Sequence, residues 1–365
     1  MSRRAATPNR RAGSLSMMLG AALLPLIGSC AVTPASDALQ LPATTLSVIG
    51  APVVVDARTR FRALFCAVLS RSEPGTPERR CDELLWRLPD ESPALATPTG
   101  TLSLDPRMRL LIVGGAFSDC FPPSSTPFAE GARRLREMGL VVEYAAISGR
   151  SSSEFNAKII AARIATIPAA AGGPLVIIGH SKGTADVLET MARYPEAASR
   201  ISAVVSVAGA VNGSPVADRY REAYDSLLRA RALGHCPPGD GGLLDSLSRS
   251  TRLRWLASNA LPANAKLYSL AAFTTPARLA RALARPQQLL SRIDARNDGQ
   301  LLAQDQVIPG STVLGYLNAD HWAVAVRIED EFPVLAHRPA GTPLVPQEAM
   351  LEAILLLVQQ DLAAR

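Results

Sequence analysis

Short apolar runs alternate with segments of helical periodicity from about Leu102 onward. Runs that are apolar throughout indicate buried parallel strands, because helices cover both faces of such a sheet. The pattern therefore predicts an α/β fold with a mostly parallel, doubly wound sheet. The expected strands are 108–113, 140–147, 175–178, 201–208, 266–273 and 311–317, and the expected helices are 128–138, 154–167, 184–194, 276–292 and 346–363.

Two segments depart from this alternation. Residues 216–263 are mainly helical in pattern and contain Pro237-Pro238-Gly239. Because they are too long for a simple connection, we expect them to form a cap over the sheet edge. The last helix, 346–363, is predicted to be amphipathic, since Leu351, Ile354, Leu355, Val358 and Leu362 fall on one face.

The first thirty residues have the layout of an export signal. Four arginines precede an apolar stretch of thirteen residues, Leu15–Ile27, whereas a membrane-spanning helix needs about 20. The stretch ends in Ile27-Gly28-Ser29-Cys30, which resembles the lipobox of bacterial lipoproteins. That resemblance implies a diacylglycerol on Cys30 and a lipid-anchored protein of the bacterial cell envelope, on the periplasmic or outer-membrane side. A plain secretory signal with a chance cysteine is the alternative.

A helical hairpin is predicted between this signal and the sheet. Its first apolar face comprises Phe61, Leu64, Phe65, Val68 and Leu69, and its second comprises Cys81, Leu84, Leu85 and Leu88. The expected organisation is a signal peptide at 1–29, a tether at 30–59, the hairpin at 60–100 and a main domain at 101–365.

The charge distribution argues against a nucleic-acid partner. The net charge is +6, but four of the positive charges belong to the export segment, on Arg3, Arg4, Arg10 and Arg11. A surface that binds phosphates needs clustered Lys and Arg, and the rest of the chain has no such cluster. Membrane contact is expected through the N-terminal lipid anchor.

The other cysteines are interpreted in the light of export, because disulfides form in oxidising compartments. Once Cys30 is used, Cys66, Cys81, Cys120 and Cys236 remain, and four cysteines allow three pairings. We favour Cys66–Cys81, which would close the helical hairpin, and hence Cys120–Cys236. Free buried thiols are the alternative.

The chemistry centres on Gly179-His180-Ser181-Lys182-Gly183, which matches the nucleophile elbow. An apolar strand precedes this pentapeptide and a helix follows it, as the sharp strand-to-helix turn requires. The turn directs the Ser181 hydroxyl into the space above the sheet. It also places the Lys182 backbone N–H at a helix N-terminus, where partial positive charge stabilises an oxyanion.

Here the chain resembles the α/β-hydrolase family of lipases and esterases, over roughly 102–365. The family order is serine, acid, histidine, and His321 follows the last expected strand. Asp298 is the favoured acid: its carboxylate would hold the imidazole in one tautomer while the imidazole takes the Ser181 proton. The rivals are Asp294 and Asp305, whereas Asp320 is disfavoured because an adjacent residue cannot easily reach the imidazole. The resemblance also implies a second oxyanion donor after the first main strand, the N–H of Ala116, with Phe117 next.

The remaining polar residues are expected to have structural roles. We expect His180 to pack at the elbow, the Lys182 side chain to form a surface ion pair rather than bind an anionic substrate, and His337 to be solvated. His235 beside Cys236 is interpreted as a cap-loop residue, because no second His/Cys cluster has metal-ligand spacing. No metal or organic cofactor is expected, since the chain carries neither a phosphate-binding loop nor a dinucleotide fingerprint.

These features predict a serine hydrolase that cleaves carboxylic esters through an acyl-enzyme, with a small-molecule or lipid ester as substrate. Thioester and amide hydrolysis remain open, because a fold resemblance does not choose among them. The alternative function is a catalytically inactive lipoprotein that uses the fold as an envelope binding or scaffold surface.

Overall fold

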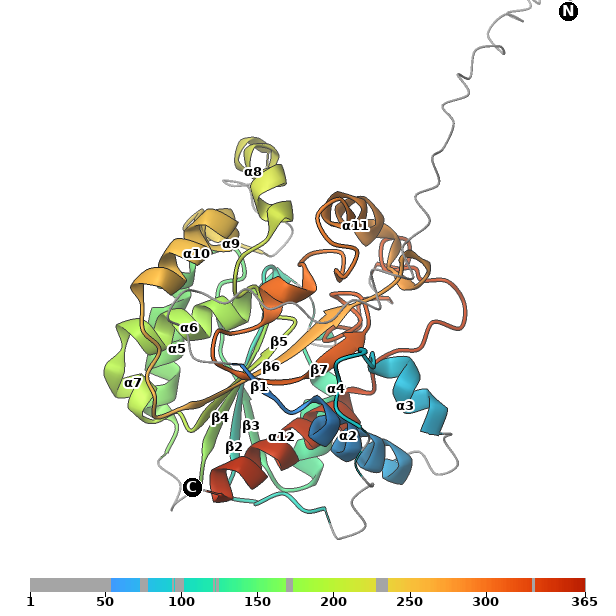
Figure 1. The fold of residues 1–365 in the computed structure, drawn as a ribbon. Coiled ribbons are helices and arrows are strands. Elements are labelled where there is room, and N and C mark those ends of the chain that lie inside the picture. The colour runs from blue at the N-terminus through green and yellow to red at the C-terminus, as the bar shows by residue number, and fades with distance from the viewer. Residues whose placement is uncertain are drawn as a thin grey trace, which may run out of the picture. The chain divides into compact units, whose positions relative to one another are not determined.

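Seven parallel strands form the central sheet, in the order β1-β7-β6-β5-β4-β2-β3 (Figure 1). The computed structural model describes residues 54–72, 78–93, 95, 102–120, 122, 125–168, 173–227, 236–329 and 332–364, all within one compact unit, Ala35–Arg365. The strands are β1 Val55–Asp56, β2 Arg109–Val113, β3 Val141–Tyr144, β4 Leu175–His180, β5 Ala203–Val207, β6 Lys266–Phe273 and β7 Thr312–Asn318. All strand pairs are parallel, which confirms the predicted α/β class.

Helices cover both faces of the sheet. On one face Leu110 and Ile112 of β2 share a core with α2 (Arg58–Ser72), α4 (Ala129–Glu137) and α12 (Gln347–Ala363). On the other face Leu111 and Val113 pack in a core with α5 (Ser153–Thr166) and α6 (Lys182–Arg193). Successive side chains of a strand enter opposite layers, so the inner strands are buried throughout and their sequences carry no polar alternation.

The N-terminal hairpin belongs to the first of these two cores, the one that contains Leu110 and Ile112. Phe61 and Phe65 of α2 are completely buried, and α2 packs along α12 (Figure 1). A Cys66–Cys81 disulfide joins α2 to α3 (Glu78–Leu84), with Cα atoms 5.6 Å apart. This is the predicted pairing.

The cap helices lie at the end of the sheet where β4 and β5 finish (Figure 1). They are α8 (Pro215–Leu227), α9 (Leu243–Leu247) and α10 (Arg249–Ser258), in the segment predicted to form the cap. A short helix α7 (Pro195–Ser199), which the pattern did not reveal, follows α6. The second predicted disulfide, Cys120–Cys236, joins the turn η1 (Ser118–Cys120) to the chain before α9.

Two predicted helices differ in the structure. Instead of one helix over 276–292 there are two short turns, η3 (Pro276–Arg278) and η4 (Arg281–Leu283), before α11 (Ala284–Ser291). The chain bends because the Ala280 N–H donates to Asp320 and the Arg281 and Ala282 N–H groups donate to the loop carbonyls of His337 and Leu335. These tertiary hydrogen bonds replace the ones that a continuous helix would make.

Helix α12 is not amphipathic over most of its length. Its residues from Ala349 to Val358 are all buried, because α2, α4 and the sheet surround it. Its buried carboxylate, Glu352, forms an ion pair with Arg71 of α2. A helix that is apolar nearly all round is buried in a large core.

The predicted signal peptide, Cys30 and most of the tether lie outside the described residues. Within the described part of the chain, no helix has the length and hydropathy needed to cross a bilayer.

Candidate active site

Ser181 occupies a strained turn between β4 and α6. Its backbone has φ 54° and ψ −127°, outside the regions that residues with a Cβ normally adopt. Such a conformation costs about 1–3 kcal/mol and persists only where the surroundings enforce it. A Cβ on Gly179 would lie 2.7 Å from the Thr184 Cα, and one on Gly183 would lie 2.3 Å from the Gly114 carbonyl oxygen. Both glycines of the pentapeptide are therefore required by backbone contact.

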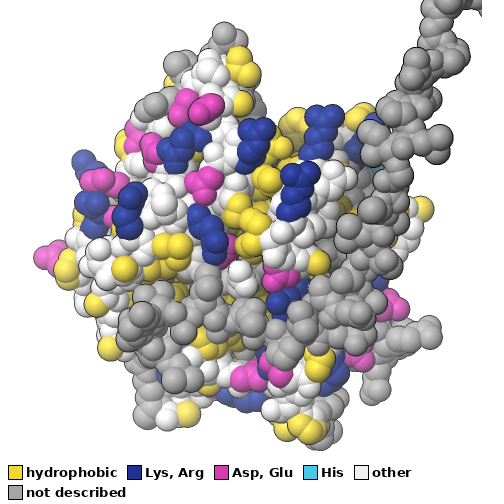
Figure 2. All heavy atoms as spheres, turned by 45° about the horizontal axis from the view of Figure 1, so that its top comes forward, with side chains coloured by type: hydrophobic (Ala, Val, Ile, Leu, Met, Phe, Trp, Pro, Cys, Tyr) yellow, Lys and Arg dark blue, Asp and Glu magenta, His cyan; other side chains and the backbone are white. Residues whose placement is uncertain are grey.

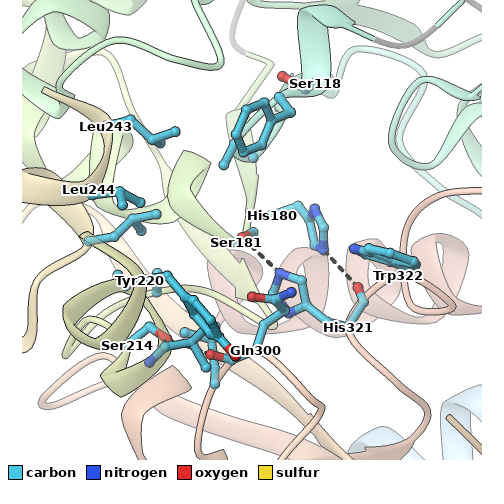
Figure 3. A pocket seen from close by; sticks show the side chains of 18 of the residues that line it. Ser118, His180, Ser181, Ser214, Tyr220, Leu243, Leu244, Gln300, His321 and Trp322 are labelled. Atoms are coloured by element: carbon cyan, nitrogen blue, oxygen red, sulfur yellow. Dashed lines mark hydrogen bonds between the residues drawn. The ribbon is translucent and has the colours of Figure 1, made fainter. Parts of the chain in front are cut away.

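The structure brings Ser181, His321 and Asp298 into one hydrogen-bonded chain, of which Figure 3 shows the bond between Ser181 and His321. Ser181 Oγ lies 2.8 Å from His321 Nε2, and His321 Nδ1 lies 2.7 Å from Asp298 Oδ2. With the proton on Nδ1, the imidazole donates to the carboxylate and accepts from the serine hydroxyl. The three residues stand at the ends of different elements: β4, the loop after α11 and the loop after β7.

The Asp298 carboxylate is fully buried and has several donors. Its Oδ1 accepts from the N–H groups of Gln300 and Leu301, at 2.8 and 2.7 Å. Its Oδ2 accepts from Gln306 Nε2 at 3.3 Å as well as from His321. A buried charge needs such partners, and they fix the carboxylate against the imidazole.

The rival carboxylates are engaged elsewhere. Asp294 pairs with Arg296, and Asp305 pairs with Arg249 at 2.8 Å. Asp320 is fully buried, accepts from the Trp322 and Ala323 N–H groups and pairs with Arg338. Asp320 thus shapes the loop that carries His321. Within the described part of the chain, its carboxylate makes none of its hydrogen bonds with the imidazole, as expected for the residue adjacent to His321.

Two backbone N–H groups have no acceptor among the described residues: that of Ala116, which lines a cavity at Ser181, and that of Lys182, the residue after Ser181. The neighbouring Phe117 has φ 60° and donates its N–H to the Gly149 carbonyl at 3.0 Å, so it is already engaged. Ala116 follows β2, and Lys182 begins α6, where the helix dipole adds positive potential. This pair of free donors suits a developing oxyanion.

Gly115 lets the Ala116 loop approach Ser181. A Cβ there would lie 2.7 Å from Ser181 Cβ and 3.2 Å from Ser181 Oγ. We expect Gly115→Ala to lower kcat/KM for an ester about 10²- to 10³-fold, because the clash displaces the Ala116 donor or the hydroxyl. Gly139→Ala is the control: its φ of 91° strains the alanine backbone and costs stability, but its Cβ meets no atom within 4 Å, so the folded variant should keep its kcat/KM. Equal activity of the two variants would contradict this assignment.

His180 supports His321 from the side of the sheet (Figure 3). It is buried, its Nε2 lies 3.3 Å from the His321 carbonyl oxygen, and the two ring centroids are 5.1 Å apart. Burial is the largest cause that lowers the pKa of His180 well below its ordinary value of 6.5, and the electrostatic effect of the neighbouring His321 adds to it. The imidazole is therefore neutral and donates to the carbonyl, consistent with the expected packing role.

A buried neutral histidine makes stability depend on pH. Below about pH 6.5 the unfolded chain takes up a proton at His180 that the folded chain does not, so stability is lost as pH falls toward the folded-state pKa. Between pH 7.5 and 5.0 we expect the free energy of unfolding to fall about 1–2 kcal/mol less in His180→Gln than in the unmodified chain. Urea unfolding at the two pH values measures this difference. Parallel pH dependences would refute it.

An apolar cavity of about 480 Å³ opens at Ser181. None of the described lining residues is Asp, Glu, Lys or Arg. Figure 2 turns this end of the molecule forward and shows hydrophobic side chains in the middle of the face, with Lys and Arg side chains around them. The apolar walls come from the cap and from the loop after β7: Val216, Tyr220, Tyr224, Leu227, Leu243, Leu244, Leu247, Trp322, Val326 and Ile328.

Lys182 does not form the surface ion pair that the sequence predicts. Its side chain is fully buried, and Nζ lies 2.7 Å from Asp186 Oδ1, one helical turn later. Burial arises because α6 packs on α5, which covers this side of the elbow. The Lys182 ammonium therefore contacts no substrate, which leaves the backbone N–H as the group of this residue that can.

The other candidates offer no metal site. Asp119, Cys120 and Cys236 form one cluster of ligand types among the described residues, but its two sulfurs are bonded to each other. His337 is exposed, as expected, and His235 lies outside the described residues.

Sequence reasoning missed several residues that hold the site. Gln306 contacts Asp298 and also bridges to the backbone of Ala272, and Arg338 fixes Asp320. Neither residue belongs to a local motif. Each contacts its partner only because the fold brings two separate parts of the chain together. No signal in the chain could have identified them.

A solved structure of similar fold and length is the metagenomic carboxyl esterase MGS0156. It is 35% identical, with a TM-score of 0.78, over 88% of this chain and 97% of its own. The propeptide form of the Bacillus licheniformis lipase BlEst2 is 18% identical, with a TM-score of 0.50, over 66% of this chain and 53% of its own, and shows the fold alone. No protein-family model matches the chain, and neither does any curated protein.

Proposed function

Because the chain belongs to the α/β-hydrolase family of esterases and lipases, we propose that it is a serine hydrolase that cleaves carboxylic esters through an acyl-enzyme. The observation that carries the proposal is the hydrogen-bonded chain from Ser181 through His321 to Asp298 at the floor of an apolar cavity. The similarity to a carboxyl esterase supports ester hydrolysis as the class of reaction.

In the acylation step Ser181 Oγ attacks the ester carbonyl carbon, and His321 Nε2 takes the hydroxyl proton. Asp298 stabilises the imidazolium and holds its Nδ1–H in place. The Ala116 and Lys182 N–H groups donate to the oxygen that becomes negative in the tetrahedral intermediate. His321 then returns the proton to the alcohol oxygen as the C–O bond breaks, leaving an ester on Ser181.

In the deacylation step water takes the place of the alcohol. His321 accepts a proton from water, the hydroxide attacks the acyl carbon, and Ser181 leaves with the proton that His321 returns. The residues named here complete both steps.

The cavity favours an uncharged, apolar acyl group. Among the residues that the structure describes, its walls carry no Asp, Glu, Lys or Arg side chain that would neutralise a charge, and burying an unpaired charge is costly. Since Val216 and Tyr220 of α8 and Leu243 and Leu244 of α9 line it, the cap is the part of the chain that selects substrates. Lipid and other envelope esters have this chemistry.

The test is hydrolysis of p-nitrophenyl esters by the purified protein. We expect butyrate and octanoate esters to be cleaved with kcat/KM at least about tenfold above that for the succinate hemiester, whose free carboxylate would be buried unpaired. The matching p-nitroanilide serves as the amide control and should react more slowly. Absence of hydrolysis for every ester would overturn the proposal.

We also propose that the mature protein is anchored in the bacterial cell envelope by lipid on Cys30. The support is the sequence pattern of the first thirty residues. Cells fed an alkynyl fatty acid should incorporate it into the intact protein but not into Cys30→Ser. Equal incorporation into both would refute the anchor.

A further inference from the structure

Lys182 is an unusual residue for its position. It is the first residue of α6, where a cation opposes the helix dipole, and its side chain and that of Asp186 are both completely buried. The Lys182 Nζ lies 2.7 and 2.9 Å from the two Asp186 oxygens. Replacing a buried ion pair with well-packed apolar residues is often neutral or stabilising, so stability alone does not account for the pair.

Asn156 extends this pair to a second element. Its Nδ2 donates to Asp186 Oδ2 at 2.7 Å and to the Ser148 carbonyl at 2.9 Å. Its Oδ1 accepts from the Ser148 N–H at 3.0 Å. Asn156 is fully buried on α5, so one side chain joins the first turn of α6 to the loop after β3.

The same loop holds the Ala116 segment. The carbonyl of Gly149, next to Ser148, accepts from the Phe117 N–H at 3.0 Å. The Gly149 N–H donates to Asp119 Oδ1, also at 3.0 Å. A Cβ on Gly149 would lie 2.6 Å from the Phe117 nitrogen, which shows how closely the two loops approach.

We propose that Lys182, Asp186 and Asn156 are positioning residues that hold the two oxyanion donors in register. Their polar bridge begins at the residue whose N–H is one donor, Lys182. It ends, through Ser148 and Gly149, on Phe117, which is the residue that follows the other donor, Ala116. The two donors come from separate elements, α6 and the loop after β2, and the bridge fixes the spacing between them.

The bridge explains why a buried lysine stands beside the nucleophile. An oxyanion hole is effective only when its donors are aimed before the charge develops. A directional hydrogen-bond network fixes geometry more tightly than apolar packing, because each hydrogen bond specifies a distance and an angle. The inference rests on the proposed function, since it assigns these residues to transition-state stabilisation.

The experiment compares Lys182→Met and Asn156→Ala with the unmodified chain and with Arg62→Met. Arg62 and the buried Glu91 form an ion pair in the N-terminal hairpin, with Nε 2.7 Å from Oε1. Arg62→Met therefore also breaks a buried pair, but away from Ser181. Asn156→Ala is the milder variant, because it leaves the Lys182–Asp186 pair intact, and it decides the matter if Lys182→Met does not fold.

The first readout is the steady-state rate on p-nitrophenyl butyrate. Both bridge variants should lower kcat about tenfold or more while KM changes less than about twofold, because the donors act on the transition state. Arg62→Met should lower the melting temperature without lowering kcat. Folded bridge variants that keep the kcat of the unmodified chain would overturn the proposal.

The second readout is amide hydrogen exchange over residues 114–120, which is independent of turnover. Exchange there should be faster in both bridge variants and unchanged in Arg62→Met. Unchanged exchange in the bridge variants would refute the bridge. If the unmodified chain hydrolysed no ester, the proposed function would fail, and the exchange data would still decide whether the bridge holds the loop.

Discussion

Replacing Ser181 with alanine is expected to lower kcat on p-nitrophenyl butyrate about 10⁶-fold, the loss found when a triad nucleophile is removed. The covalent step disappears, and the donors of Ala116 and Lys182 can then assist only direct attack by water. The fold should persist, because the side-chain hydrogen bond of Ser181 is the one to His321 Nε2.

Two measurements separate this result from unfolding. Initial rates give the loss of activity, and thermal unfolding gives the melting temperature, which should stay within about 2 °C, the shift that roughly 1 kcal/mol produces in a domain of this size. Activity within tenfold of the unmodified chain would mean that another residue is the nucleophile.

Asp298→Asn is expected to lower kcat about 10⁴-fold, the loss that follows when the triad histidine is held in the wrong tautomer. Asp298 Oδ1 accepts from the Gln300 and Leu301 N–H groups. The single oxygen of asparagine satisfies these two donors, so its NH₂ group must face His321 Nδ1. The imidazole then carries its proton on Nε2 and cannot accept the proton of Ser181.

The control for this substitution is Asp294→Asn. Asp294 was a rival for the same role and differs from Asp298 by pairing with Arg296 instead of His321. Its amide variant should keep kcat within about twofold, because the Asp294 carboxylate contacts Arg296 and not the His321 imidazole. A large loss in Asp294→Asn with little change in Asp298→Asn would reverse the assignment.

The elbow and the sheet were predictable because their causes are local. Gly179 and Gly183 are required where backbones touch, and the apolar run 175–178 is required where a strand is covered on both faces. The order of residues along the chain then pointed to His321 and Asp298. Each prediction used either a constraint among neighbouring residues or the order of residues along the chain.

The environment of individual side chains was less predictable. The Lys182 side chain was expected at the surface, but α5 covers it, and no periodicity in α6 indicates that covering. The helix expected over 276–292 breaks where Asp320 and the 335–337 loop accept its N–H groups. In both cases a partner distant in sequence supplies the deciding contact.

The same reason explains why the bridge behind the oxyanion donors was not foreseen. Asn156 and Asp186 are ordinary polar residues in helical sequence, and only the packing of α5 on α6 brings their side chains within 2.7 Å. Buried polar groups must find partners, but the chain does not state which ones.

Covalent labelling of the folded protein identifies the residue that acts as nucleophile. The purified protein is treated with a fluorophosphonate, which phosphonylates a serine activated by its histidine, and the adduct is located by peptide mass spectrometry. We expect one adduct per chain, on Ser181, and none after prior denaturation or in Ser181→Ala. An adduct on another residue, or no adduct on the folded protein, would contradict the assignment of Ser181 as nucleophile, and the second outcome would favour a catalytically inactive binding or scaffold protein.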